Sequence, residues 1–275
     1  LSTNGENIMM NEINRPDAKG RKLAQPIVSA RVPEACEIFD APEARTYIDG
    51  CDFPQTSDYA IVASEIAREF GNSGRISGHI VEVCPGPGNL CGELLTVGAQ
   101  KVTGVDGSPV MLAHARTKFA TQIVGGKIDF RQGMAQALPL ADNTVNGIVN
   151  FNSFHQFSDD QRALEALREM ARVLKSGGWG LVRDFKRGAS QGAIDKRLEK
   201  TRPEIKPLLL ASLDAAFTSD EFRAFLGQIP GIEFSVTDTQ DPWRLSEIVC
   251  ERMRNDPVAH WMDFLISQDV IMKKL

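Results

Sequence analysis

The sequence is short of the features that mark several common classes of protein. Its five cysteines are an odd number without a CxxC pair. This disfavours a disulfide framework or a zinc site and predicts free thiols in a reducing, cytoplasmic compartment. A formal net charge of −5 disfavours a general nucleic-acid binder, which usually carries a basic surface. No apolar run approaches the ~20 residues of a membrane span, and the polar first 22 residues disfavour a signal peptide.

An alternation of strand-like and helix-like segments begins after Gly74. Such βαβα alternation predicts an α/β fold in which a doubly wound, mostly parallel sheet carries helices on both faces. Right-handed crossovers would place the C-terminal ends of the strands along one edge, where ligands bind. Apolar runs predict seven strands, at residues 79–84, 101–105, 128–132, 145–151, 179–185, 232–239 and 247–252.

Several helix starts have a recognisable cap. Ser108 followed by Pro109 is a favoured N-cap and first-turn combination. The segments 158–161 and 218–221 each have the pattern of a capping box. Gly177-Gly178 is expected to end the helix that follows the first of these boxes.

The sequence divides into three parts. Residues 1–45 are polar and predict an N-terminal arm or a lid over a ligand, and residues 46–252 predict the α/β domain. Residues 253–275 predict a C-terminal helical extension, because Asp256–Leu275 has an amphipathic pattern. Within the domain, 186–216 predicts a helical insert that caps the substrate side. Its basic residues suit either a solvated helix face or a surface that attracts an acidic or carrier-bound substrate.

The most informative segment is HIVEVCPGPGNL at 79–90, where an apolar run ends in a glycine turn. A dinucleotide fingerprint GxGxxG that starts at Gly86 would need glycine at position 91, where the chain has Cys91. This disfavours NAD without excluding it. S-adenosyl-L-methionine (SAM) has no phosphates but has an amino-acid tail and a ribose. Glu82 is placed to hold the ammonium of that tail, and Asp106, which ends the next run, can accept hydrogen bonds from both ribose hydroxyls.

Four segments together resemble the class I SAM-dependent methyltransferases, in the style of the ubiquinone/menaquinone-biosynthesis enzymes and their small-molecule relatives. They are EVCPGPG, GVDGSP, GMAQALPLADNTVNGIVNFNSFHQF and ALREMARVLKSGGWGLVRDF. The resemblance covers about 47–252 and implies a Rossmann-like seven-stranded fold. It also implies SAM as cofactor and methyl transfer to an oxygen, nitrogen or carbon atom of a small molecule. The alternatives are a SAM-binding regulatory protein and an NAD-dependent oxidoreductase.

The resemblance also assigns cofactor-contact positions. These are Glu82, Gly86 and Gly88 in the first motif, Asp106 and Gly107 at the ribose, Met134 and Ala135 at the adenine, and Asn150 and Phe151 beside the methionine part. Tyr47 and Tyr59 lie in the segment that forms a lid in relatives, and either could bond the SAM carboxylate. The chain departs from the family at Cys84, where glycine is common, and at Met134, where aspartate is common.

Two further residues have a functional and a structural interpretation. His155 follows the fourth strand and could be a catalytic base or a substrate-positioning group, because histidine titrates near neutrality. It could equally be a structural residue bonded within its loop. Asp184 could face the substrate, but a salt bridge to Arg187 is the favoured interpretation.

Overall fold

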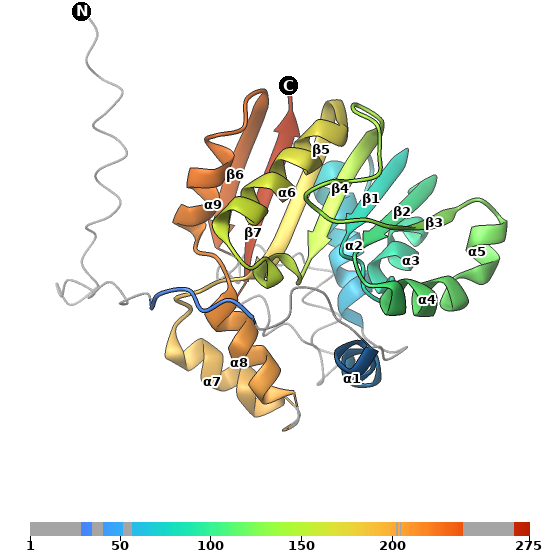
Figure 1. Ribbon diagram of the computed structural model, residues 1–275. Coiled ribbons are helices and arrows are strands. Elements are labelled where there is room, and N and C mark those ends of the chain that lie inside the picture. Colours follow the sequence, from blue (N-terminus) through green and yellow to red (C-terminus); the bar gives the residue numbers. More distant parts are fainter. Residues whose placement is uncertain (1–28, 35–40, 52–56, 202, 204, 239–266) are drawn as a thin grey trace, which may run out of the picture.

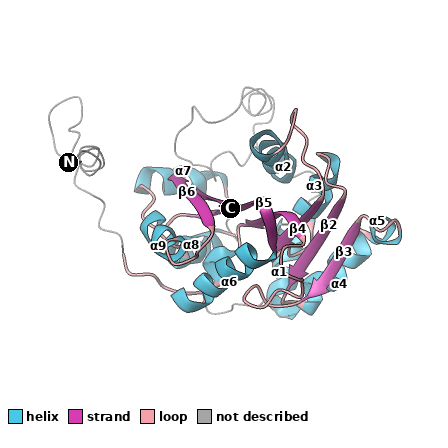
Figure 2. Ribbon diagram, turned by 90° about the horizontal axis from the view of Figure 1, so that it is seen from above, coloured by secondary structure: helices cyan, strands magenta, loops and turns pink. Residues whose placement is uncertain are grey.

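The structure is a computed structural model that describes residues 29–34, 41–51, 57–201, 203, 205–238 and 267–275. Its centre is a seven-stranded sheet with the order β3-β2-β1-β4-β5-β7-β6, flanked by helices on both faces (Figures 1 and 2). Strands β1 to β5 pair in parallel, and β7 pairs antiparallel with both β5 and β6. The predicted α/β fold is therefore confirmed. The strands are β1 His79–Val83, β2 Lys101–Asp106, β3 Ile128–Gln132, β4 Val145–Phe151, β5 Leu174–Phe185, β6 Ile232–Asp238 and β7 Ser267–Lys274.

The helices follow the predicted alternation. They are α1 Ala41–Cys51, α2 Ser57–Phe70, α3 Asn89–Thr96, α4 Pro109–Lys118, α5 Ala120–Val124, α6 Asp160–Val173, α7 Gln191–Lys200, α8 Lys206–Ala215 and α9 Ser219–Leu226, with the short 3-10 helix η1 at Phe154–Gln156. None of the helices in the described part of the chain has the length and apolarity needed to cross a membrane. The predicted insert at 186–216 is helical, since it contains α7 and α8.

The predicted helix caps are mostly confirmed. Ser108 accepts from the Met111 backbone N–H with Pro109 in the first turn, and Thr218 and Glu221 form a complete capping box. The box predicted at 158–161 is wrong by one residue, because Asp159 rather than Ser158 caps α6 by accepting from the Arg162 N–H. Helix α6 ends at Val173, ahead of the glycine pair that was expected to end it, because Leu174 already pairs with Val145 of β4.

Two apolar cores form because neighbouring residues of each buried strand face opposite sides of the sheet. Ile80 packs with α2, α3 and α4 on one face, whereas Val81 packs with α6 and α9 on the other. Both side chains are fully buried. Burial on both faces explains why the sequence shows short continuous apolar runs here rather than alternation.

The C-terminal helix predicted for 253–275 is wrong for the residues that the structure describes, because Ser267–Lys274 is β7. Gln268, Val270 and Met272 are buried while the residues between them are less so, which is the period of a strand. Strand β7 lies between β5 and β6, so the sheet continues beyond the predicted domain end at 252. The strand predicted at 247–252 and the residues 253–266 lie outside the described part of the chain.

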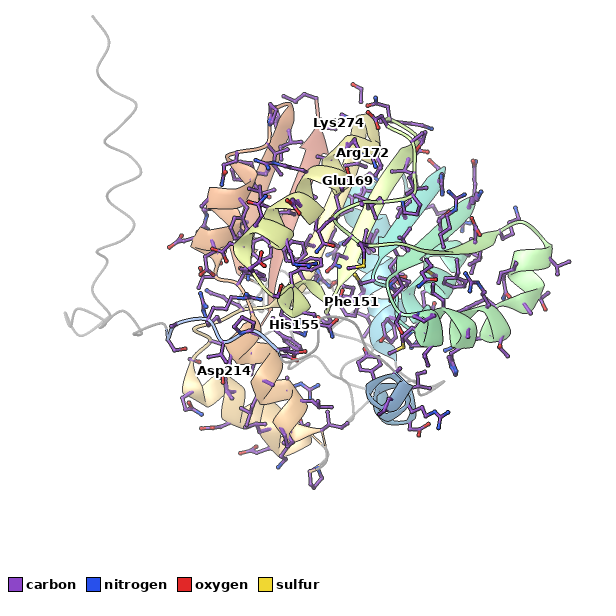
Figure 3. The ribbon with its side chains drawn as sticks, viewed as in Figure 1. Phe151, His155, Glu169, Arg172, Asp214 and Lys274 are labelled. Carbon is purple, nitrogen blue, oxygen red and sulfur yellow. The ribbon has the colours of Figure 1, made fainter. Side chains whose placement is uncertain are left out.

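The C-terminal ends of β4 and β5 lie at the lower end of the sheet in Figure 1, beside α1, α7, α8 and residues 29–34. Figure 3 places Phe151 and His155 at this lower end, with Asp214 of α8 below them. Glu169, Arg172 and Lys274 lie at the opposite end. The carboxyl edge of the sheet is therefore flanked by segments from the N-terminal part of the chain and by the insert at 186–216.

A buried ion network joins α2 to the antiparallel edge of the sheet. Arg183 of β5 donates from Nε and Nη2 to Asp269 of β7 at 2.7 and 2.8 Å, and from Nη1 to Glu65 of α2 at 2.5 Å. Burial by itself would lower the pKa of Arg183, but the two carboxylates outweigh it and raise the pKa. The guanidinium therefore holds two buried carboxylates in place.

Replacing Arg183 with leucine is expected to lower the free energy of unfolding by about 3–5 kcal/mol, because Glu65 and Asp269 would keep buried charges without a cation. Urea unfolding followed by circular dichroism measures the change. The control is Arg162→Leu, whose ion pair with Asp159 spans 3.9 Å between exposed side chains and is expected to contribute less than about 1 kcal/mol. Equal losses in the two variants would contradict the assignment.

Candidate functional site

A pocket of about 790 Å³, part of it open to solvent, lies at the carboxyl edge of the sheet, where the strand order reverses between the neighbouring strands β1 and β4. This is the topological switch point of the fold, at which ligands of α/β sheets bind. The pocket is lined by Tyr47, Tyr59, Glu82, Cys84, Pro85, Gly86, Asp106, Gly107, Ser108, Met111, Met134, Ala135, Gln136, Phe151, Asn152, Ser153, Gln156 and Phe157.

The Asp106 carboxylate joins the two turns that form the floor of this pocket. Its Oδ2 accepts from the Gly86 N–H at 2.9 Å, and its Oδ1 accepts from the Ser108 N–H at 2.8 Å. Burial raises the pKa of Asp106, and these backbone donors partly offset that effect. The Gly107 N–H is a third backbone donor, and a carboxylate has about four lone-pair sites, so it can still accept from a ligand.

The glycine turn has the left-handed backbone that glycine tolerates best. Gly86 has φ +53°, and a Cβ atom there would have only the Met111 sulfur near it, at 3.9 Å. The absence of a side chain therefore leaves room for a ligand. Cys84 also has a positive φ, of +56°, although it carries a side chain. This conformation is uncommon outside glycine and asparagine, and it places the half-buried thiol, which is not part of a disulfide, in the pocket wall.

Glu82 is the most unusual charged residue of the pocket. It is buried at 3% exposure, and its Oε2 has no hydrogen-bond partner. Burial raises the pKa of Glu82 to about 8, although a hydrogen bond with the Cys91 thiol opposes the shift. An unpartnered buried carboxylate oxygen is energetically costly, so Glu82 is suited to receive a cationic hydrogen-bond donor from a ligand.

Aromatic and sulfur-containing side chains form the rest of the wall. Tyr59 packs edge-on against Phe151, with ring centroids 5.7 Å apart. Tyr47 reaches the pocket from α1, and Met134 and Ala135 reach it from the turn after β3. The structure thus brings together eight of the predicted site residues, namely Tyr59, Glu82, Gly86, Asp106, Gly107, Met134, Ala135 and Phe151.

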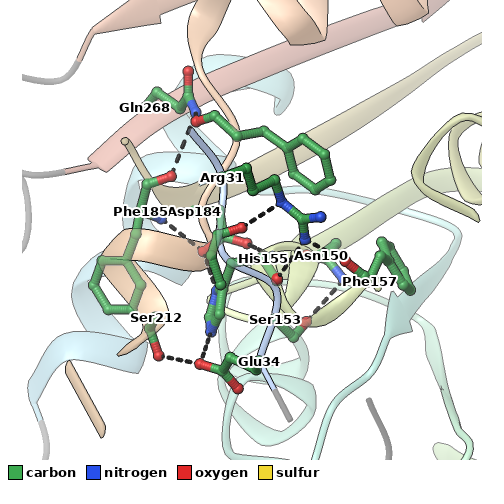
Figure 4. A network of polar contacts seen from close by, with 12 residues as sticks. Arg31, Glu34, Asn150, Ser153, His155, Phe157, Asp184, Phe185, Ser212 and Gln268 are labelled. Carbon is green, nitrogen blue, oxygen red and sulfur yellow. Dashed lines mark hydrogen bonds and ion pairs between the residues drawn. The ribbon is translucent and has the colours of Figure 1, made fainter. Parts of the chain in front are cut away.

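Three predicted site residues do not line the pocket. Gly88 caps α3 with φ +79° and packs against Phe130, whose ring carbon Cζ would lie 2.8 Å from a Cβ at this position. Asn150 is buried and donates from Nδ2 to the Val83 carbonyl and the Ser153 hydroxyl. His155 is buried at 3% exposure in a separate polar network (Figure 4).

His155 is bonded to Asp184, which the sequence did not predict. The ring Nδ1 lies 2.7 Å from Asp184 Oδ1, and the His155 backbone N–H donates to Oδ2 at 2.7 Å. The favoured interpretation of Asp184 as a partner of Arg187 is wrong, because Arg187 instead pairs with Glu221. The turn after β4 directs the His155 ring toward β5, and adjacency of strands cannot be read from local sequence.

Sequence reasoning also missed the part of the pocket wall after β4. Asn152, Ser153, Gln156 and Phe157 line it together with Ser108 and Gln136. The first four of these residues lie in NFNSFHQF, directly after the end of a strand, and this position is the signal that could have identified them. Asn152 has φ +50°, which marks the sharp turn that aims this segment at the pocket.

Comparisons with known proteins agree with this geometry. Residues 80–178 match the family described as "Methyltransferase domain". The chain is 32% identical over 124 residues to a demethylmenaquinone methyltransferase of Chlorobaculum parvum, a match that covers 45% of this chain and 47% of that protein. The similarity to methyltransferases thus includes the part of the chain that carries the glycine turn and Asp106. The chain spans about half the length of the curated relatives that it matches.

Two solved structures share the fold of this chain at low sequence identity. A candidate SAM-dependent methyltransferase from Methanococcus maripaludis aligns with a TM-score of 0.61 at 20% identity, over 88% of this chain and 97% of that one. The plantazolicin methyltransferase BpumL, solved with a monoazolic desmethylPZN analogue and S-adenosylhomocysteine (SAH), aligns with a TM-score of 0.56 at 13% identity, over 84% of this chain and 93% of that one. These alignments cover β-strands and helices well outside residues 80–178.

Gly88→Ala is expected to destabilise the methyltransferase fold through packing against Phe130. The matched control is Gly126→Ala, which also has a positive φ, of +66°, but has no atom within 4 Å of the new Cβ. We expect a loss of about 1–2 kcal/mol for Gly126→Ala from backbone strain, and about 1–3 kcal/mol more for Gly88→Ala from overpacking. Urea unfolding compares them, and equal losses would restore a ligand-contact role to Gly88.

Proposed function

We propose that this protein binds SAM in the pocket and transfers its methyl group to a small-molecule acceptor. The observation that carries the proposal is one arrangement around the Gly86 turn. A buried carboxylate oxygen of Glu82 without a partner and the acceptor-rich Asp106 carboxylate lie on either side of a turn with space for a ligand. The methyltransferase domain match covers all three residues.

The donor groups of SAM suit the residues of the pocket. Glu82 would take the ammonium of the amino-acid tail, and Asp106 would accept from the ribose hydroxyls through its remaining lone pairs. Met134 and Ala135 would contact the adenine, the former through its thioether and the latter through its backbone. Tyr59 and Phe151 would exclude water beside the methionine part.

Chemistry at the site needs alignment more than proton transfer. SAM supplies a methyl group that is already activated by the positive charge on its sulfur. The protein therefore has to hold the acceptor atom in line with that methyl group and to keep water out. Ser153 and Phe157 line the pocket after β4 and would face the acceptor there, next to Phe151. An acceptor that reacts as an anion would need no base there.

A small-molecule acceptor is supported by the relatives, which include an enzyme named for demethylmenaquinone and one named for plantazolicin. NAD is disfavoured by Cys91, because this residue is fully buried and hydrogen-bonds Glu82 where the dinucleotide fingerprint would need glycine. A regulatory protein of this fold would bind SAM without turnover. Formation of SAH from SAM in the presence of mixtures of small-molecule acceptors distinguishes an enzyme from such a regulatory protein.

Asp106→Asn is expected to weaken SAM binding about 100-fold, because it removes the charge that strengthens two hydrogen bonds of about 1.5 kcal/mol each. Isothermal titration calorimetry measures the dissociation constants. The control Asp129→Asn, in a half-exposed pair with Arg131, is expected to bind SAM as the wild type does. Comparable affinities in wild type and Asp106→Asn would refute the ribose contact, and a wild type that binds NADH but not SAM would refute the cofactor.

Binding of SAM is also expected to release a proton from Glu82. With a pKa of about 8, Glu82 is mostly protonated at pH 7, and pairing with an ammonium favours its ionised form. Affinity should therefore rise by up to about tenfold per pH unit between pH 6 and 7.5, where an ordinary α-amino group stays charged. Calorimetry in buffers of different ionisation enthalpy should find close to one proton released, and close to none for Glu82→Gln. No release by the wild type would contradict the pairing.

A further inference from the structure

Residues 29–34, here called the strap, lie across the carboxyl edge of the sheet between the turn after β4 and helix α8 (Figures 1 and 4). Arg31 holds the strap in place. Its guanidinium donates to the carbonyls of His155, Phe157, Ser158 and Ala215, and it lies 4.0 Å from the centre of the Phe217 ring. The Val32 N–H donates to the Asp214 carbonyl at 3.1 Å. The strap is therefore anchored mainly through Arg31 and backbone contacts.

The strap inserts one carboxylate into the structure, that of Glu34. Its Oε1 accepts from the Ser212 hydroxyl of α8 at 2.7 Å and lies 3.6 Å from His155 Nε2. The Glu34 side chain is 14% exposed and that of His155 only 4%. A hydroxyl from the helical insert and an imidazole from the turn after β4 thus converge on one carboxylate oxygen.

The surroundings of the His155 imidazole favour its protonated, cationic form. Burial by itself would lower the pKa of His155, but the Asp184 and Glu34 carboxylates outweigh it and raise the pKa. Asp184 also accepts from the backbone N–H groups of His155 and Phe185, at 2.7 and 2.6 Å. Three donors therefore fix Asp184 on one side of the ring, and Nε2 is left to face a second anion on the other side.

This carboxylate position borders the cofactor pocket. Ser153, Gln156 and Phe157 line the pocket, and His155 lies in the same turn with its ring on the other side. The Glu34 carboxylate accepts a short hydrogen bond from the Ser212 hydroxyl. Its distance to His155 Nε2 is too long for a hydrogen bond. A ligand carboxylate could form both contacts at least as well.

We propose that His155 and Ser212 form a carboxylate-binding subsite next to the cofactor pocket, which Glu34 occupies until the carboxylate of a ligand displaces it. That this ligand is the methyl acceptor rests on the proposed function, whereas the subsite does not. In this arrangement Asp184 is a positioning residue, because it acts through His155. The proposal gives the substrate a chemical class, a small carboxylic acid, and gives the strap the role of a displaceable occupant.

Acetate tests the subsite directly when Glu34 is shortened. In Glu34→Ala the position is vacant, and we expect acetate to bind at least about 10-fold more tightly than to the wild type, where the tethered Glu34 competes at an effective concentration in the millimolar range or above. Binding is measured by the shift of the His155 Nε2 signal in ¹⁵N–¹H NMR spectra. Acetamide, which has the same shape without charge, should not bind.

Three variants of full-length protein complete the design. Glu34→Gln keeps the position filled and should not gain acetate affinity. Glu34→Ala combined with Ser212→Ala should lose most of the gain in the same NMR assay. Glu34→Ala combined with His155→Gln should also lose it, and there acetate binding is measured by calorimetry because the imidazole signal is absent. The Ser212 variant keeps the test valid if the buried His155 change impairs folding. Equal binding of acetate and acetamide to Glu34→Ala, or a gain that survives Ser212→Ala, would overturn the subsite.

The wild type provides an independent test of displacement. The His155 Nε2 signal of the wild type should shift in about 0.1 M acetate but not in acetamide, because a free carboxylate at this concentration competes with the tethered Glu34. An unchanged signal in both solutions would refute displacement. SAM affinity is measured on the same samples. Loss of SAM binding alone would refute the proposed function, whereas normal SAM binding without carboxylate binding would refute the subsite alone.

Discussion

The contact on which the site depends is the Asp106 carboxylate between the Gly86 and Ser108 N–H groups. It fixes two turns that follow neighbouring strands, so the ends of β1 and β2 keep one spacing at the carboxyl edge of the sheet. Every other lining group is placed relative to these turns. Glu82 comes from the strand before the first turn, and Met111 from the helix that Ser108 caps. The Asp106 carboxylate thus has a structural role that does not depend on a ligand.

Electrostatics divide the carboxyl edge of the sheet into two regions. Around β1 and β2, Glu82 and Asp106 are buried carboxylates whose pKa values are raised by burial, and no basic side chain lines the pocket in the described part of the chain. Beyond β4, Arg31 and His155 supply positive charge. The first region suits a cationic cofactor and the second an anionic acceptor. Such a division would orient the two reactants without any base between them.

Much of the fold could be predicted, because its strands are short apolar runs bounded by glycine turns and capped helices. Strands β3 and β4 fall at the predicted residues, and Ser108 and Thr218 cap the predicted helices. Strand β7 was missed because its segment, Ser267–Lys274, contains both charged and apolar residues and fits a helical and a strand pattern alike. The segment forms a strand because it pairs with the edges of both β5 and β6.

The sequence by itself determined the fold class, the glycine turn and the two carboxylates at the strand ends, since each depends on residues close together in the chain. Only the tertiary structure decided that His155 meets Asp184 and Glu34, which lie 29 and 121 positions away from it in the chain. It also moved Gly88 from the ligand to the packing of Phe130. Contacts of this kind depend on which strands and segments become neighbours, and that choice is made by burial over the whole chain rather than by local pattern.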